Sequence, residues 1–315
     1  MRNKFLAAAA QAAPAFLNLE GCLDIACHWI EKAGKQGVKV LVFPETWLPG
    51  YPVWLDNIPN IAQWDYLPAK EIFARLVDNS PEINSPAVDR LCVAAAEANL
   101  NLVMGMHERD GNTLYNTILY ISDEGILLGK HRKLIPTYTE RLIWGRGDGS
   151  TLTVVDTSAG RIGGLVCWEH WMPLARQAMH DRRELIHAAV WPSVHERHLI
   201  ASRTYAFEGR CFVIAAGSIL NPQHFPEDVD LFKDVPDDGY WITGGSTIIG
   251  PDAGILAGPV ENEETLLVAE IDPSMVAKES MTLDVSGHSS RPDVFKLIIN
   301  CLLYTSDAAD ECVNV

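Results

Sequence analysis

Three residues of types that could catalyse a hydrolysis each follow an apolar run in the sequence. Glu45 closes LVFPE, Lys133 ends the segment GKHRK, and Cys167 closes GGLVC. We expect each run to be a strand, and strand ends at one edge of an α/β fold can converge on one site. A thiol with a pKa of about 8.5 must lose its proton before it attacks, so it needs a base. The trio therefore predicts a thiol hydrolase with a carboxylate base and an ammonium.

Cys167 lies where an apolar strand gives way to a polar segment. Gly163 and Gly164 loosen the strand, and residues 172–184 then show helical spacing with Pro173 in the first turn. We expect a strand-to-helix elbow, where free backbone N–H groups and a helix N-terminus favour a thiolate. On position alone, however, a free cysteine that ends an apolar strand is more often a core residue.

The other members of the trio also have a functional and a structural interpretation. Glu45 would be the base, with a pKa raised toward neutrality, or simply a turn carboxylate. Lys133 would counter charge on the attacked atom with help from the Trp168 N–H, or be one of three adjacent cations on a solvated turn. The sequence has no G-x-S-x-G motif, and its ten histidines leave a Cys–His pair open.

The bulk composition excludes several classes of protein. Of the 315 residues, 25 are Lys or Arg and 41 are Asp or Glu, which gives a net charge of −16 and argues against nucleic-acid or anionic-membrane partners. Residues 5–13 are too short for a membrane span and are interpreted as a first strand. Seven cysteines without a C-x-x-C pair favour a reducing cytoplasm. His195 and His198 are weak evidence for zinc, and we expect no metal.

Hydrophobic periodicity predicts the elements that must position the trio. We expect helices over residues 19–35, 85–98, 172–184 and 198–209. We expect strands over residues 5–11, 38–43, 102–107, 114–121, 126–129, 151–157, 161–167, 185–191, 211–217, 246–249, 255–257 and 265–271. Residues 47–68, rich in Trp, Tyr and Pro, are expected to be a long loop that walls a pocket. This order favours an α/β fold in which two sheets stack with helices outside.

Four segments together resemble a known family. LVFPETWLPGYP, GKHRKLIPTYTERLIWGRGDG, GGLVCWEHWMPLAR and AAVWPSVHE occur in the order typical of the nitrilase (carbon–nitrogen hydrolase) superfamily, and specifically of its nitrilase branch. The resemblance covers about Phe5 to Phe295 and implies a single-domain, four-layer αββα sandwich. It implies a Glu-Lys-Cys triad on the trio described above and a supporting carboxylate at Glu140. His170 departs from the Asn that is common at its position.

The resemblance also implies an activity. It implies hydrolysis of an organic nitrile to the carboxylic acid and ammonia through a cysteine thioimidate and an acyl-enzyme, with no metal or organic cofactor. Trp54, Tyr138, Trp191 and His195 are expected in the substrate pocket, although a core position is equally open for the tryptophans. The alternatives are an amidase or a cyanide-hydrating member of the same superfamily, or a non-catalytic oligomerising homologue.

Assembly, location and boundaries are further expectations. Family members pair through the helices after the nucleophile, here residues 172–184 and 198–209, so we expect a homodimer or a larger spiral oligomer. We expect a cytoplasmic enzyme acting on a small-molecule nitrile, without nucleic-acid or membrane partners. The hydrolase domain is predicted to span residues 1–295. Residues 296–315 are predicted to be a non-native or disordered tail, because residues 301–315 resemble translated adaptor sequence.

Overall fold

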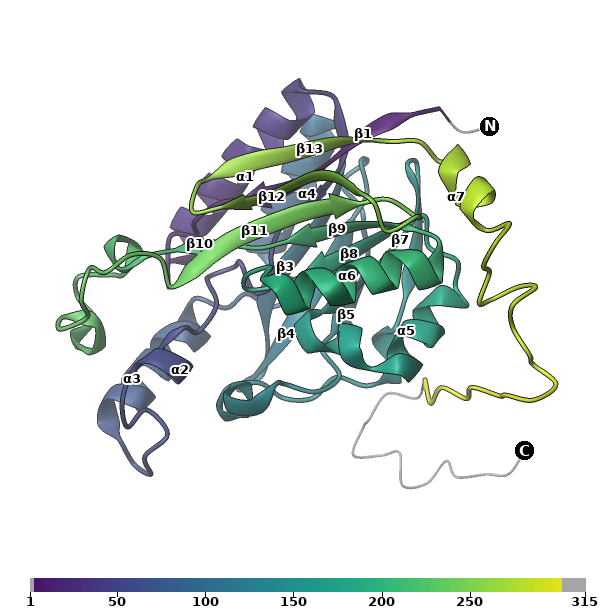
Figure 1. The fold of residues 1–315 in the computed structure, drawn as a ribbon. Helices are drawn as coiled ribbons and strands as arrows, with labels where there is room; N and C mark the ends of the chain where they lie inside the picture. The colour runs from purple at the N-terminus through teal and green to yellow at the C-terminus, as the bar shows by residue number, and fades with distance from the viewer. Residues whose placement is uncertain (1–2, 302–315) are drawn as a thin grey trace.

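Two β-sheets lie face to face between two layers of helices in the computed structural model, which describes residues 3–301 (Figure 1). The first sheet contains β1 (Phe5–Gln11), β2 (Val38–Val42), β3 (Asn101–Asp110), β4 (Thr113–Ile121), β5 (Leu127–Arg132) and β13 (Thr265–Ile271). Its six strands run in the order β13-β1-β2-β3-β4-β5. Because β1, β2 and β3 are mutually parallel and buried on both faces, their sequences are nearly continuous apolar runs.

The second sheet repeats this plan with a parallel centre. It contains β6 (Val154–Thr157), β7 (Gly160–Val166), β8 (Ile186–Val190), β9 (Phe212–Ala216), β10 (Ile219–Leu220), β11 (Ile242–Ile249) and β12 (Ile255–Glu261). The order is β10-β11-β9-β8-β7-β6, with β12 paired to β11, and β7, β8 and β9 are parallel. Side chains of both sheets, such as Val42 and Leu165, meet in one buried cluster between them.

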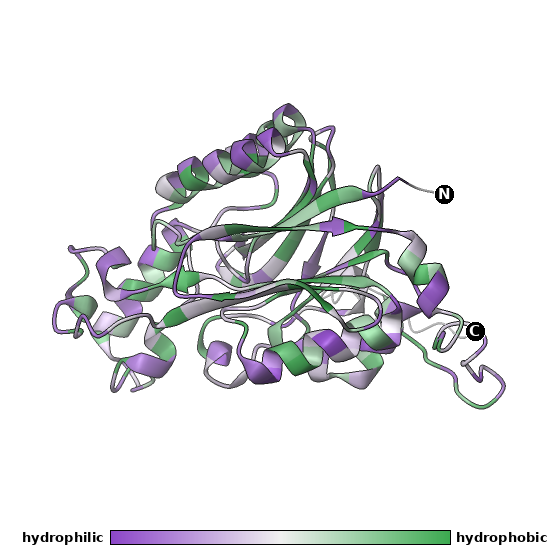
Figure 2. Cartoon of the chain, turned by 45° about the horizontal axis from the view of Figure 1, so that its top comes forward, coloured by the Kyte–Doolittle hydropathy of each residue, from purple (hydrophilic) through white to green (hydrophobic). Residues whose placement is uncertain are grey.

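Helices cover the outer face of each sheet. The pair α1 (Leu19–Lys35) and α4 (Pro86–Ala98) covers the first sheet, and α5 (Pro173–His180) with α6 (Glu196–Gly209) covers the second. Figure 2 shows helices above and below the sheets, with apolar residues concentrated on the strands between them. The α1 stripe that includes Leu23, Ala26 and Ile30 packs on the first sheet, which explains its apolar spacing. The αββα sandwich is confirmed.

A small lobe lies beside the sandwich, where the sequence predicted only a long loop. Residues 47–68 contain α2 (Trp54–Asn57), and α3 (Leu67–Asp78) follows with Pro68 in its first turn. These helices pack with the segment 221–241 around a separate apolar cluster that includes Phe16 and Phe232 (Figure 1). The prediction of an uninterrupted loop over residues 47–68 was therefore wrong, although the segment does reach the site.

Two other boundaries differ from the predicted ones. A 3₁₀ turn, η3 (Cys167–Trp171), separates β7 from α5, so the long helix does not begin at the elbow. The helix predicted over residues 172–184 ends at His180 because a turn follows, in which Arg183 has a φ of 55°. A final short helix, α7 (Ser274–Glu279), was not predicted.

Two further expectations concern the C-terminal tail and membrane-spanning helices. Residues 296–301 form neither helix nor strand, and the rest of the predicted tail, residues 302–315, lies outside the described residues. Within residues 3–301, no helix has the length and apolar composition that a bilayer crossing requires.

Candidate active site

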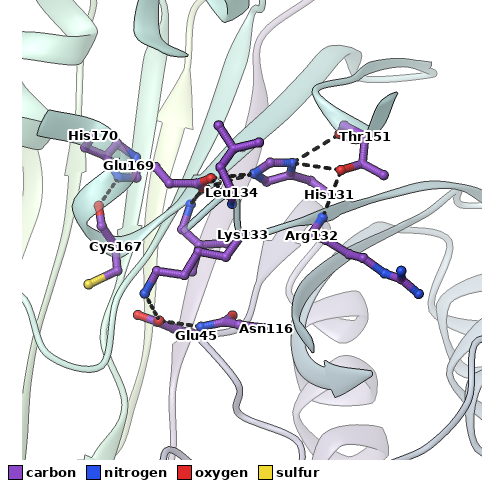
Figure 3. A network of polar contacts seen from close by, with 12 residues as sticks. Glu45, Asn116, His131, Arg132, Lys133, Leu134, Thr151, Cys167, Glu169 and His170 are labelled. Atoms are coloured by element: carbon purple, nitrogen blue, oxygen red, sulfur yellow. Dashed lines mark hydrogen bonds and ion pairs between the residues drawn. The ribbon is translucent and has the colours of Figure 1, made fainter. Parts of the chain in front are cut away.

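The turn after β7 holds Cys167 in an unusual backbone conformation. Cys167 has a φ of 52°, in the left-handed region that non-glycine residues rarely occupy. Its carbonyl oxygen accepts a hydrogen bond of 2.7 Å from Nδ1 of His170, one turn later (Figure 3). Such strain persists only where surrounding contacts enforce it, so the elbow depends on the groups that hold its backbone.

Glu169 connects this elbow to the end of β5. Its carboxylate accepts the N–H of Val166 at 2.7 Å and the N–H of Leu134 at 2.8 Å, and it contacts His131 Nε2 at 2.9 Å (Figure 3). Burial alone would raise the pKa of Glu169, but His131 and the two N–H groups reverse the effect and lower it. Since Val166 precedes Cys167 and Leu134 follows Lys133, one carboxylate fixes the spacing of the two residues.

The predicted trio meets in one buried cluster. Lys133 Nζ lies 3.0 Å from Glu45 Oε1 and 2.6 Å from Glu140 Oε2. Cys167 Sγ and one oxygen of each carboxylate all lie within 4.8 Å of one another. Three chain segments supply these groups: the residues after β2, the residues after β5 with the following turn η1 (Tyr138–Leu142), and the elbow after β7. The site therefore lies between the two sheets at one edge of the sandwich.

The surroundings of Glu45 alter the proton affinity of its carboxylate. Burial raises its pKa to about 7, although the Lys133 ammonium acts in the opposite direction. Oε1 accepts hydrogen bonds from Asn116 Nδ2 at 2.6 Å and from Lys133. Oε2 is buried and has no hydrogen-bond partner among residues 3–301. This oxygen is free to accept a proton from the thiol or from water.

The thiol of Cys167 is protonated at rest. Burial raises its pKa well above the usual value, and the charge of Glu45 adds to the increase, against the opposing effects of Lys133 and the Trp168 N–H. The Trp168 N–H favours the thiolate, as the sequence analysis expected, but burial and the charge of Glu45 outweigh it. The helix N-terminus expected at the elbow is absent there, because α5 begins only at Pro173. Burial is the largest single effect on Lys133 and lowers its pKa, but the acidic groups Glu45, Cys167 and Glu140 together outweigh burial and raise the lysine pKa. The thiol therefore needs a base, while Lys133 remains an ammonium.

Glu140 is held by three donors. Tyr51 donates its hydroxyl to Oε1 at 2.8 Å, while the Thr137 N–H and Lys133 Nζ both lie 2.6 Å from Oε2. Tyr51 and Asn116 are thus polar contacts of the cluster that the sequence analysis did not identify. Tyr51 follows Glu45 within LVFPETWLPGYP, which was a usable signal, whereas Asn116 lies in the middle of β4.

A pocket of about 320 Å³ opens onto Cys167. It is lined by Tyr51, Val53, Asp56, Asn57, Thr137, Tyr138, Thr139, Glu140, Cys167, Trp168, Pro192, Ser193, His195, His198, Trp241 and Ile242. Tyr138 and His195 therefore lie where the sequence analysis expected them.

Trp54 and Trp191 do not belong to the lining of this pocket. Trp54 packs against Phe16 and Phe232 in the lobe, and Trp191 stacks on His170 with ring centroids 4.7 Å apart. Both are core residues, because neighbouring aromatic rings cover their faces.

The oxygen and sulfur atoms of Glu45, Glu140 and Cys167 are close enough to ligate a cation. Lys133 Nζ already lies against both carboxylates, so an ammonium occupies the cation position in this cluster. The HERH histidines have another role, since His198 Nδ1 accepts the His195 N–H at 3.0 Å at the start of α6.

The chain is similar to known proteins over most of its length. The family model described as carbon-nitrogen hydrolase matches residues 6–278. An aliphatic nitrilase of Sinorhizobium fredii (strain HH103) is 39% identical over 300 residues, covering 95% of this chain and 96% of that protein. The bifunctional nitrilase/nitrile hydratase NIT4B of Nicotiana tabacum is 38% identical, covering 92% and 84%. The Saccharomyces cerevisiae Nit3 structure, of the nitrilase superfamily, shares the fold with a TM-score of 0.71 at 19% identity, covering 92% and 98%.

Proposed function

Because the chain belongs to the carbon–nitrogen hydrolase family, and to its nitrilase branch, we propose that Glu45, Lys133 and Cys167 hydrolyse an organic nitrile to the carboxylic acid and ammonia. The protein is a nitrilase, and its substrate is a small-molecule nitrile. One observation supports the proposed roles of these residues. The buried Lys133 ammonium lies 3.0 Å from the Glu45 carboxylate and 2.6 Å from the Glu140 carboxylate, beside the Cys167 thiol that lines the pocket. This set supplies a nucleophile, a base and a fixed positive charge.

The first half of the reaction forms a covalent bond to sulfur. Glu45 Oε2 accepts the Cys167 proton, and Sγ adds to the nitrile carbon. One C≡N π-bond becomes a lone pair on nitrogen, which takes the thiol proton from Glu45 to give a neutral thioimidate and a carboxylate again at Glu45. Lys133 and the Trp168 N–H stabilise the negative charge that develops on this nitrogen.

The second half releases both products. A water that gives a proton to Glu45 adds to the thioimidate carbon, and Glu45 passes this proton to the nitrogen. The hydroxyl proton of the resulting tetrahedral intermediate then moves to the nitrogen by the same route as the C=O bond forms, so that ammonia leaves and a thioester remains with Glu45 ionised. A second water, activated in the same way, displaces Sγ and yields the acid, and the sulfur recovers its proton. Glu140 keeps Lys133 oriented throughout, because it binds the ammonium opposite Glu45. Each turnover consumes two waters and releases one ammonia.

The test measures products from nitriles and from their matching amides. The protein should release ammonia and acid from at least one nitrile of a panel of aliphatic, aromatic, arylacetonitrile and dinitrile compounds. Cys167→Ala should abolish this release and retain the circular dichroism spectrum. Ammonia from amides alone would identify an amidase, and no turnover of either class would identify a non-catalytic homologue.

We also propose a homodimer formed through α5 and α6, which larger spiral assemblies would extend. Four large apolar side chains on or beside these helices are exposed: Trp171, Leu174, Ile200 and Phe207. Exposed apolar side chains gathered on one face are typical of protein interfaces. Since η3 carries Trp171 next to the elbow, the proposed interface would lie close to the nucleophile.

The proposal also covers the cellular location of the protein, its partners and the limits of its hydrolase domain. Six free cysteines among the described residues support a reducing, cytoplasmic location. The excess of acidic residues supports the absence of nucleic-acid and anionic-membrane partners. We propose a hydrolase domain of residues 1–295.

A further inference from the structure

Three buried side chains behind the nucleophile form a continuous polar series that the reaction does not use. His170 Nδ1 lies 2.7 Å from the Cys167 carbonyl oxygen, and His170 Nε2 lies 3.0 Å from Nε2 of His187. His187 Nδ1 in turn lies 2.9 Å from Glu184 Oε1. We call His170, His187 and Glu184 the rear network.

We propose that the rear network positions Cys167 for catalysis and does so only while it holds one additional proton, so that Glu184 is a positioning residue for the nucleophile. This inference rests on the proposed function and deepens it. It concerns the geometry of the elbow rather than a step of the bond-making chemistry.

The number of hydrogen atoms that the rear network needs for its hydrogen bonds supports this proposal. The rear network makes three contacts, and each contact needs one hydrogen between its two heavy atoms. The Cys167 carbonyl brings none, and two neutral imidazoles bring one each. A carboxylate at Glu184 also brings none, so with Glu184 ionised one contact would bring two lone pairs together. A third hydrogen, on any of the three side chains, satisfies every contact.

Electrostatics places the third hydrogen on Glu184. Burial lowers the pKa of His170 to about 3 and lowers that of His187 well below its usual value, so both rings are neutral. Burial raises the pKa of Glu184 to about 7, and this group therefore holds the proton in mildly acidic solution. Glu184 then donates to His187 Nδ1, His187 donates to His170, and His170 donates to the Cys167 carbonyl.

The surroundings of Glu184 allow it to titrate. Tyr205 donates its hydroxyl to Glu184 Oε2 at 2.5 Å, and this contact persists in both protonation states. Other titratable or charged groups that act on Glu184 are His180 of α5, Arg182 of the following turn, Arg161 of β7, Tyr120 of β4 and Cys211. Glu184 also borders a cavity of about 230 Å³ whose lining shares no residue with that of the substrate pocket. Arg183, Glu208, Arg210 and Asp284 are the further charged residues that line the same cavity as Glu184. This cavity is a route by which the proton can exchange with solvent.

The protonation state of Glu184 affects the reaction through the backbone of the elbow at Cys167. Cys167 has a φ of 52°, and the hydrogen bond from His170 Nδ1 to the Cys167 carbonyl oxygen stabilises this backbone conformation. When Glu184 loses its proton, one contact in the series must break. A break at His170 Nδ1 removes the support of the elbow directly, whereas a break farther back removes the contact that holds the His170 or His187 ring in place. In each case the strained elbow is less constrained, and we expect Sγ to move from its place beside Glu45. Thiol reactivity should therefore fall as pH rises through about 7, relative to an enzyme whose third hydrogen cannot dissociate.

The test replaces the titrating group by a permanent donor. In Glu184→Gln, the amide N–H takes the place of the acid O–H at every pH, and the amide oxygen still accepts from Tyr205. The measurement is the rate of Cys167 alkylation by iodoacetamide, followed by mass spectrometry of the Cys167 peptide between about pH 6 and pH 9. The titration of Glu45 is common to both proteins, so it cancels in the ratio of wild type to Glu184→Gln. We expect this ratio to fall about tenfold across the range.

A second variant tests the rear network, and the alkylation readout separates this inference from the proposed nitrilase activity. Glu184→Leu removes the third hydrogen, and at about pH 6 its alkylation rate should be about tenfold below that of Glu184→Gln. If Glu184→Leu does not fold, as judged by circular dichroism, the pH ratio for Glu184→Gln decides alone. A constant ratio would overturn the inference. Alkylation requires no nitrile, so absence of nitrile turnover in the wild type would contradict the proposed function without affecting this result.

Discussion

Activation of the thiol depends on the protonation state of Glu45. Because burial raises the pKa of Glu45 to about 7, the base is ionised above that pH and protonated below it. We therefore expect kcat/KM for a nitrile to rise as pH increases toward about 7, while above that pH the loss of the rear-network proton from Glu184 opposes a further increase. Glu45→Gln should lower kcat by about a thousandfold and remove this dependence, since a positioned base contributes roughly 10²–10⁴-fold.

The control for this pH profile is a second buried glutamate. Glu108 is paired with Lys130 and Arg132 outside the cluster, so Glu108→Gln should leave the shape of the profile unchanged. A wild-type profile that stays flat between about pH 5 and pH 8 would show that Glu45 is not the titrating base.

The Tyr51 hydroxyl is expected to act through Glu140. Tyr51→Phe removes the 2.8 Å hydrogen bond to Glu140 Oε1 and leaves the aromatic wall of the pocket in place. Loss of one buried bond to a charged group should reduce kcat by about tenfold, with a smaller effect on KM. Steady-state kinetics checks this result, with Tyr66→Phe at the start of α3 as the matched control. Equal kinetics for both variants would exclude a role for the hydroxyl.

At this scale the sequence identified the reacting residues but not their contacts. Glu45, Lys133 and Cys167 were recognisable because each ends an apolar run, and the resemblance added Glu140. Asn116 was not recognisable, since nothing local distinguishes a polar residue in β4 that faces Glu45 from one that faces solvent. Trp54 and Trp191 show the same limit: whether an aromatic ring lines a pocket or a core depends on distant segments that cover it.

Among the elements, β3 and the segment after β2 pack so closely that a side chain would not fit between them. A Cβ atom at Gly105 would lie 1.9 Å from the carbonyl oxygen of Pro44, the residue before Glu45. We expect Gly105→Ala to displace this segment, lower stability by about 1–3 kcal/mol and reduce kcat.

The matched control lies in the same sheet. At Gly129 of β5 a Cβ atom would meet its nearest neighbour at 3.6 Å, an ordinary contact, so Gly129→Ala should retain activity. Urea unfolding and nitrile turnover measured on both variants check the prediction. If Gly105→Ala were as stable and as active as Gly129→Ala, the backbone packing described for Glu45 would be incorrect.

Element boundaries were predictable where one periodicity extends without interruption. The apolar stripe predicted α1 at its observed limits, and alternation with turn residues predicted β13 in the same way. The helix α3 was missed because only Ile72 and Leu76 of its residues are buried, which leaves a weak stripe beside many prolines and aromatics. The 3₁₀ turn at Cys167 was missed because Glu169 and His170 of the turn are held by residues of distant segments, Glu169 by His131 and Leu134 and His170 by His187.

For the whole molecule, stacking of the two sheets creates the site. The Glu45 and Lys133 segments follow strands of the first sheet, whereas Cys167 follows a strand of the second, so neither sheet alone contains the cluster. The alternation of strands and helices predicted this stacking, since two such halves must bury their apolar faces against each other. The lobe formed by α2, α3 and residues 221–241 was not predictable, because its apolar cluster joins segments far apart in the sequence.

The proposed dimer is tested at the same scale. Leu174 is 70% exposed on α5, and Leu174→Asp should shift the protein toward monomer by placing a charge in the interface. Val93→Asp, at a 56% exposed residue on α4 on the opposite outer layer, should leave the assembly unchanged. Sedimentation velocity of the wild type and both variants distinguishes these outcomes. A monomeric wild type would refute the dimer.

The covalent bond between Cys167 and the substrate carbon is the central claim, and mass spectrometry of the enzyme quenched in acid during nitrile turnover tests it most directly. We predict a mass increase on the peptide that contains Cys167. The increase should equal the nitrile for the thioimidate, or the corresponding acyl group minus the thiol hydrogen for the thioester. The increase should be absent from Cys167→Ala. Nitrile turnover with an unmodified Cys167, or a turnover-dependent adduct on another residue, would contradict the account.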